Sequence, residues 1–68
     1  MSFSYDNLWK LAIDKKLSKT ELRKKAGITP TTLAKLSKDQ YVSMNVLDRL
    51  CECLNCEVSD IIQHKKNN

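Results

Sequence analysis

Three cysteines are the most reactive side chains in this sequence, spaced as Cys51-x-Cys53-x-x-Cys56. Closely spaced thiolates can bind zinc, but a structural zinc site needs four ligands. On a helix, Cys51 and Cys53 would point about 200° apart. The single histidine, His64, is eight residues beyond Cys56. We therefore expect no metal site, with Cys51 in the core, Cys56 partly buried at a helix end and Cys53 exposed.

The remaining side chains do not predict catalysis. His64 lies near the end of the chain, and one glycine cannot form a glycine-rich phosphate-binding loop. The spacing of the acidic residues does not suggest a pair of carboxylates in one cleft. We expect a protein that is not an enzyme and that binds no cofactor and no small-molecule ligand.

The basic residues are unevenly distributed along the chain. Residues 1–38 contain nine Lys and Arg against three acids, a net charge of +6, whereas residues 39–64 contain one Arg and five acids, a net charge of −4. Threonines lie among the lysines in the segment TPTTLAKLSK. Because ammonium, guanidinium and hydroxyl groups donate hydrogen bonds to phosphates, we expect a polyanion to bind the N-terminal half. A lysine-rich surface that serves only solubility is the alternative.

Residues 17–38 must position these side chains, and their sequence predicts two short helices. Ser18 and Glu21 have the spacing of a capping box, and Leu17 and Leu22 have the spacing of a hydrophobic staple. Gly27, the only glycine, stands where the first helix would end in a left-handed residue. The first helix is thus predicted over residues 18–26.

The second helix is predicted over residues 30–38. Thr29 can cap its start, and Pro30 follows at the first helical position, where a missing N–H has no cost. Two helices joined by a short turn containing glycine predict a helix-turn-helix.

The rest of the chain completes a small helical domain. Ser4 and Ser43 are predicted to cap helices that extend to about residues 15 and 54, Trp9 is expected in the core, and Ser59 is predicted to cap a last short helix. No stretch alternates apolar and polar residues long enough to predict a strand. We expect one all-α domain of five helices over residues 1–68, with its core at about 5–62 and a frayed tail at 64–68.

The pattern resembles the Cro/repressor-type helix-turn-helix family, also called the xenobiotic-response-element (XRE) family, over residues 5–62. Within the motif, the positions that the family keeps apolar or small are occupied by Leu22, Ala26, Gly27, Ile28, Leu33 and Leu36. Two positions depart from the family pattern: Lys19 stands where glutamine is usual, and Arg23 where alanine or glycine is usual. The resemblance implies a lambda-repressor-like DNA-binding fold.

The resemblance also implies roles for individual side chains. The helix at residues 29–38 would enter the major groove of DNA by its N-terminal end. Thr31 and Lys35 would contact base edges, which carry the sequence information. The phosphate contacts, which fix register, would come from Lys19, Thr29, Thr32 and Lys38. Helix capping and an ordinary exposed surface are the alternative roles of the threonines.

We therefore expect a sequence-specific regulator of transcription that binds double-stranded DNA, from a bacterium or phage, with repression as its action. A weak homodimer is expected, formed or tightened on DNA, through the fourth and fifth helices and the tail. Since no apolar run follows Met1, we expect a cytoplasmic protein without a membrane partner. The alternatives are a protein-interaction module of the antitoxin or anti-repressor kind, and a non-specific nucleoid-binding protein.

Overall fold

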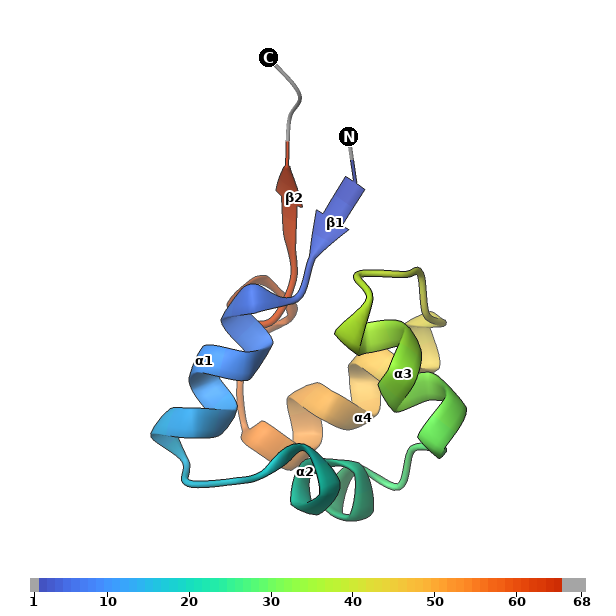
Figure 1. Cartoon of the computed structure of the whole chain (residues 1–68). Coiled ribbons are helices and arrows are strands. Elements are labelled where there is room, and N and C mark those ends of the chain that lie inside the picture. The colour runs from blue at the N-terminus through green and yellow to red at the C-terminus, as the bar shows by residue number, and fades with distance from the viewer. Residues whose placement is uncertain (1, 66–68) are drawn as a thin grey trace.

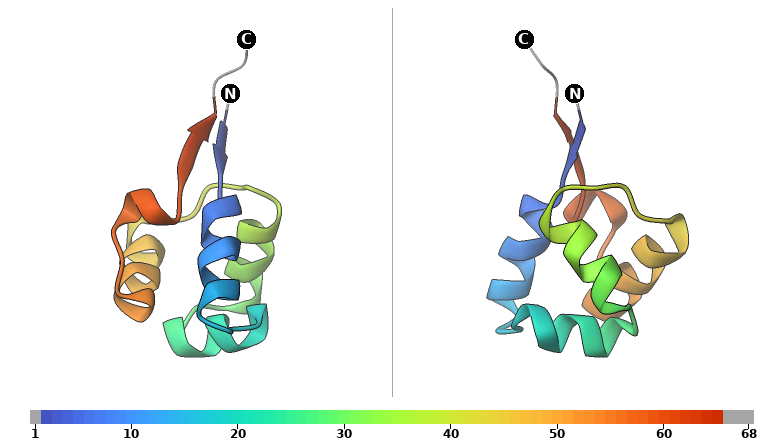
Figure 2. Two further views of the ribbon diagram at one scale, coloured as in Figure 1. Left: turned by 90° about the vertical axis from the view of Figure 1, so that its left-hand side faces the viewer. Right: turned by 45° about the vertical axis from the view of Figure 1, so that its right-hand side comes forward.

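The computed structural model describes residues 2–65 and consists mainly of helices. In chain order its elements are β1 (Ser2–Ser4), α1 (Asp6–Asp14), α2 (Lys19–Ala26), α3 (Pro30–Ser37), α4 (Met44–Leu54), a 3-10 helix η1 (Val58–Asp60) and β2 (Gln63–Lys65). Figure 1 shows the four α-helices as one body, from one end of which β1 and β2 project together. The two further views in Figure 2 confirm that the paired strands extend away from the helices.

The start of α2 confirms the predicted capping box. The Glu21 N–H donates to Ser18 Oγ at 3.1 Å, and the Ser18 N–H donates to Glu21 Oε1 at 3.0 Å. These two bonds satisfy backbone donors that the first turn of a helix otherwise leaves unpaired. At the other end, Gly27 is left-handed with φ 71°, and its N–H donates to the Arg23 carbonyl at 3.0 Å.

The starts of α3 and α4 follow the same chemistry. The Thr32 N–H donates to Thr29 Oγ1 at 3.1 Å, and Pro30 takes the first helical position. In α4, the Val46 N–H donates to Ser43 Oγ at 3.2 Å. Both caps were predicted. Thr29 fixes the start of the second helix of the motif, as Ser18 and Gly27 fix the start and the end of the first.

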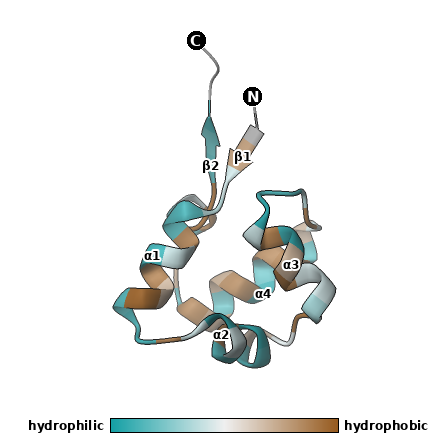
Figure 3. Ribbon diagram, viewed as in Figure 1, coloured by the Kyte–Doolittle hydropathy of each residue, from teal (hydrophilic) through white to brown (hydrophobic). Residues whose placement is uncertain are grey.

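The core draws buried side chains from every α-helix, and Figure 3 shows apolar, brown segments in α1, α3 and α4. Its members are Tyr5, Leu8, Ala12, Leu22, Ala26, Ile28, Leu36, Leu47, Leu50, Leu54 and Ile61. Trp9 is half-buried and packs against this core, as expected. Leu33, one of the apolar positions of the motif, is only half-buried, and Ile13 on α1 is 72% exposed.

The predicted count of five helices is wrong, since residues 2–65 contain four α-helices. The expected fifth helix is the single 3-10 turn η1. Its start is closed by Asp60 Oδ2, which accepts from the Glu57 N–H at 2.9 Å, and not by Ser59. Beyond α4 the chain turns at Asn55, which has φ 52°, and at Cys56. Too few positions then remain before the buried Ile61 for a longer helix.

The all-α prediction is also incomplete, because β1 and β2 pair as an antiparallel ribbon in which Phe3 faces His64. His64 and Lys65 therefore belong to a strand and not to a frayed tail; residues 66–68 of that predicted tail lie outside the described part of the chain. Three-residue strands are too short to show alternation in a sequence. Their pairing depends instead on tertiary contacts, such as the edge-to-face packing of Phe3 and His64, whose ring centroids lie 5.1 Å apart.

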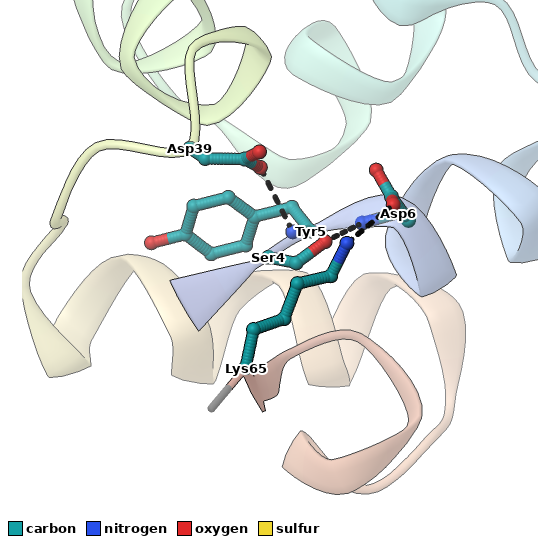
Figure 4. Close-up of polar contacts among 5 residues, drawn as sticks. All are labelled: Ser4, Tyr5, Asp6, Asp39 and Lys65. Carbon is teal, nitrogen blue, oxygen red and sulfur yellow. Dashed lines mark hydrogen bonds and ion pairs between the residues drawn. The ribbon is translucent and has the colours of Figure 1, made fainter. Parts of the chain in front are cut away.

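The ribbon also changes how α1 begins. The predicted cap Ser4 lies in β1 and is buried, and α1 starts after Tyr5. Ser4 Oγ still accepts from the Asp6 N–H at 3.2 Å, and Asp6 Oδ2 lies 3.5 Å from Lys65 Nζ on β2 (Figure 4).

No helix among residues 2–65 has both the length and the apolar character that crossing a membrane requires.

Candidate nucleic-acid interface

The exposed side of α3 presents the two side chains expected to contact bases. Thr31 and Lys35 are both exposed and lie four positions apart, hence on one face of the helix. Leu36, on the opposite face, is fully buried. The outward face of α3 is thus polar and basic, and the helix is fixed to the core through its apolar inner face.

The hydroxyl groups of two threonines, Thr29 and Thr32, meet at the start of α3. Thr29 Oγ1 accepts from the Thr32 N–H and donates to Thr32 Oγ1 at 3.0 Å. The two hydroxyl groups are therefore paired with one another within the cap, and Thr32 is half-buried. The capping role considered for Thr29 is confirmed.

The two lysines expected to contact phosphates lie toward the other end of α3. Lys38 is exposed at the C-cap, about 12 Å along the helix from its start. Lys19 is the first residue of α2, and its Nζ lies 3.3 Å from Ser37 Oγ, next to Lys38. The structure therefore separates the predicted residues into a threonine group and a lysine group, with Lys35 between them.

Lys19 also contacts α1. Its Nζ lies 4.4 Å from the centroid of the Trp9 ring, within the range of a cation–π interaction. Lys19 therefore contacts both neighbouring helices, α3 through Ser37 and α1 through Trp9. The lysine remains exposed to solvent.

Two arginines hold the turn between α2 and α3. Arg49 Nη1 on α4 donates to the Gly27 carbonyl at 2.9 Å, and Arg23 Nη1 donates to the Ile28 carbonyl at 3.4 Å. Arg23 is half-buried, so the second departure from the family pattern is accommodated by laying the side chain along the turn. Arg49 was not predicted, since nothing in a sequence links residues 22 positions apart.

A second unpredicted network holds the loop that follows α3. Asp39, with φ 56°, accepts from the Tyr5 N–H through Oδ1 at 3.1 Å, as Figure 4 shows. The Tyr5 hydroxyl donates to the Gln40 carbonyl at 2.8 Å. Burial, followed by the charge of Asp39, raises the pKa of Tyr5 above its ordinary value of 10.0, so this hydroxyl remains a donor well into the alkaline range. The chain before α1 thus fixes the C-terminal end of α3.

The cysteines are all half-buried, so the prediction of an exposed Cys53 is wrong. All three pack against the core. Burial raises the pKa of Cys51, and burial together with the neighbouring Cys51 raises the pKa of Cys56 to about 11. No group of three possible metal ligands occurs within the described range 2–65. We therefore assign the cysteines to packing.

Comparison with known proteins gives matches that cover most of the chain. Residues 7–67 match the Cro/C1-type HTH DNA-binding domain family. A relative described as "Uncharacterized HTH-type transcriptional regulator YozG", from Bacillus subtilis (strain 168), is 31% identical over 55 residues, which cover 78% of this chain. This chain spans 66% of the length of that relative.

A solved structure agrees with these matches. The crystal structure of the transcriptional regulator VanUg, Form II, superposes with a TM-score of 0.88 at 48% sequence identity. The match covers 91% of this chain and 83% of that one. A family match over nearly the whole chain, together with a helix-turn-helix whose caps and turn are formed, establishes the relationship. The chain belongs to the Cro/C1-type helix-turn-helix DNA-binding domain family.

Proposed function

We propose that this chain is a sequence-specific regulator of transcription that inserts α3 into the major groove of double-stranded DNA. The observation that carries the proposal is the exposed face of α3, on which Thr31 and Lys35 stand one turn apart. A lysine can donate to guanine O6 and N7, and a threonine can contact several bases through its hydroxyl and methyl groups. Membership of a DNA-binding domain family supports this use of the face.

The phosphate contacts in this proposal come from four further residues. Lys19 and Lys38 would bind phosphates near the C-terminal end of α3, and Thr32 near its start. Thr29 would contact a phosphate at the same end of α3, in addition to capping the helix. Such contacts fix how the protein sits on the duplex without reading its sequence.

Repression through a weak homodimer completes the proposal. Repression would follow from occupation of an operator, because the bound protein blocks access of other proteins to that DNA. Single helix-turn-helix domains usually bind two half-sites about 34 Å apart as dimers. Exposed Met44 on α4 and Val58 on η1, at 76% and 43%, flank an apolar groove on the expected dimer surface.

Selection of bound sequences from a random pool of DNA duplexes tests the proposal. We expect enrichment of one motif, repeated in inverted orientation with centres about one helical turn apart. Enrichment of a single unrepeated motif would retain DNA reading but reject the dimer. Recovery of the pool without enrichment would contradict sequence-specific binding and favour the non-specific alternative.

The protein-interaction alternative rests on the same apolar groove, since a different protein could occupy it in place of a second copy. Co-purification under low salt separates the two. Recovery of a stoichiometric protein partner, combined with no enrichment of any DNA motif, would support the alternative.

A further inference from the structure

Three helices meet at the ammonium group of Lys19. The residue begins α2, its Nζ lies 4.4 Å from the Trp9 ring centroid on α1, and the same atom donates to Ser37 Oγ on α3 at 3.3 Å. Trp9 is half-buried and packs against the core, so its ring is a fixed surface. A lysine side chain that is otherwise free to rotate is thereby confined to one region.

We propose that Trp9 is a positioning residue for DNA binding, which holds the Lys19 ammonium ready for a phosphate of the DNA backbone. The inference rests on the proposed function, because it names the residue that positions Lys19, one of the side chains proposed to contact phosphates. An ammonium has three N–H donors. Ser37 accepts one and the ring face attracts the charge, which leaves a donor for a phosphate oxygen.

The benefit of this arrangement is pre-organisation. A flexible lysine loses rotamer freedom when it binds a phosphate, and this loss weakens binding. When Trp9 and Ser37 confine the side chain beforehand, part of the loss has already occurred on folding. Tryptophan is the aromatic residue that attracts cations most strongly, so phenylalanine at this position should hold the ammonium less well.

The alternative is that Trp9 and Lys19 only stabilise the packing of α1 on the helix-turn-helix. The two roles differ in one respect. A purely structural contribution of Trp9 would affect DNA binding whether or not Lys19 is present, whereas a positioning role acts only through the Lys19 ammonium. A double-mutant cycle measured on DNA affinity separates them.

The experiment compares the unaltered chain with Trp9→Phe, Trp9→Leu, Lys19→Met and the two double variants, on the DNA duplex obtained by selection. We expect Trp9→Leu to weaken binding roughly two- to five-fold, with a smaller loss for Trp9→Phe, which keeps a ring in the core. In the Lys19→Met background, both Trp9 substitutions should leave affinity unchanged. Thermal unfolding of each variant shows which proteins remain folded, and Trp9→Phe preserves the test if Trp9→Leu does not fold.

The dependence of affinity on salt tests separately whether the Lys19 ammonium contacts a phosphate. Lys19→Met should reduce the slope of log K against log[salt] by about 0.9, the value for one phosphate contact. Lys10→Met, which removes an exposed charge from α1, is the matched control and should have no such effect.

Equal losses from the Trp9 substitutions in both backgrounds would overturn this inference and leave the proposed function in place. No loss from Trp9→Phe or Trp9→Leu in the presence of Lys19 would overturn it as well. Absence of salt-dependent DNA binding by the unaltered chain would instead overturn the proposed function, and the inference with it.

Discussion

Lys35 and Lys19 carry the same charge but stand in different surroundings. Lys35 projects from the middle of α3 into solvent, whereas the Lys19 ammonium is held between Trp9 and Ser37. A side chain on the open face of an inserted helix can reach base edges, while one held beside the helix can reach only the backbone of the DNA. Single substitutions should therefore have different consequences at the two positions.

Replacement of Lys35 by alanine is expected to relax sequence preference. Loss of a base contact should reduce discrimination at one base pair by about 1–3 kcal/mol. Lys19→Ala should instead weaken binding to all duplexes alike and lower the salt slope by about one. Affinities for the selected duplex and for a shuffled duplex would measure both effects, with Lys10→Ala as the control. If both substitutions change only the midpoint of thermal unfolding, the assigned roles are wrong.

The Cys56 thiol should make folding less stable at alkaline pH. Its pKa is raised to about 11 in the folded protein from an ordinary value of 9.0, chiefly by burial. Between these two values the unfolded chain releases a proton that the folded chain retains, so the free energy of unfolding falls as pH rises. The stabilising contribution of the protonated Cys56 thiol is fully present below about pH 9 and is lost as the pH rises toward 11. Urea unfolding from pH 8 to 11 should show a smaller decline in Cys56→Ala than in the unaltered chain, and equal declines would contradict the assignment.

At the scale of elements, what could be predicted from the sequence is what depends on neighbouring residues. The capping box of Ser18 and Glu21, the left-handed Gly27 and the caps Thr29 and Ser43 each involve atoms no more than four positions apart. Their chemistry is visible in the order of the residues. The bounds of α2, α3 and α4 were therefore predicted to within a residue or two.

Contacts between distant residues could not be predicted in this way. The bond from Arg49 to Gly27 joins positions 22 apart, the bond from Tyr5 to Asp39 joins positions 34 apart, and the β1–β2 ribbon joins the two ends of the described chain. Each depends on the packing of the whole body. The six predicted site residues were placed on α2 and α3 as expected, but their division into a threonine group and a lysine group required the structure.

Gly27 provides a test of the turn between α2 and α3. Its φ of +71° strains any residue with a Cβ, while the nearest atom to an added Cβ is Arg49 Nη1 at an ordinary 3.9 Å. Gly27→Ala should therefore cost about 1–2 kcal/mol through backbone strain and not through a clash. Gly27→Asn should cost less, since asparagine tolerates this conformation better. Urea unfolding measures both, and an equal or larger loss for asparagine would show that strain is not the cause.

At the scale of the whole molecule, the charge is divided between two halves of the sequence with opposite net charge. The basic residues 1–38 include the helix-turn-helix, and the acidic residues 39–64 include α4 and η1. A polyanion is attracted to the first half and repelled by the second, which favours one orientation on DNA. The apolar groove beside Met44, where a second copy could bind, is lined mostly by the second half, with Phe3 and Tyr5 added from the first.

Substitution of Met44 by glutamate tests this dimer surface. Met44 is the first residue of α4, where an acidic side chain suits the helix dipole, so the fold should not be weakened. We expect Met44→Glu to lose cooperative binding to a duplex with two half-sites, while binding to a single half-site is retained. Gel-shift titrations on the two duplexes measure the difference. A similar loss on both would place Met44 at the DNA and not between two copies.

The role of α3 as a DNA-reading helix is tested most directly by equilibrium binding at several salt concentrations, from about 50 to 200 mM. The unaltered chain would be titrated with the selected duplex and with a shuffled duplex of the same composition. We expect log K to fall linearly and steeply with log[salt] on both, because phosphate contacts release counterions, and the selected duplex to bind more tightly at every concentration. Binding that does not depend on salt, or no difference between the two duplexes, would contradict sequence reading by α3.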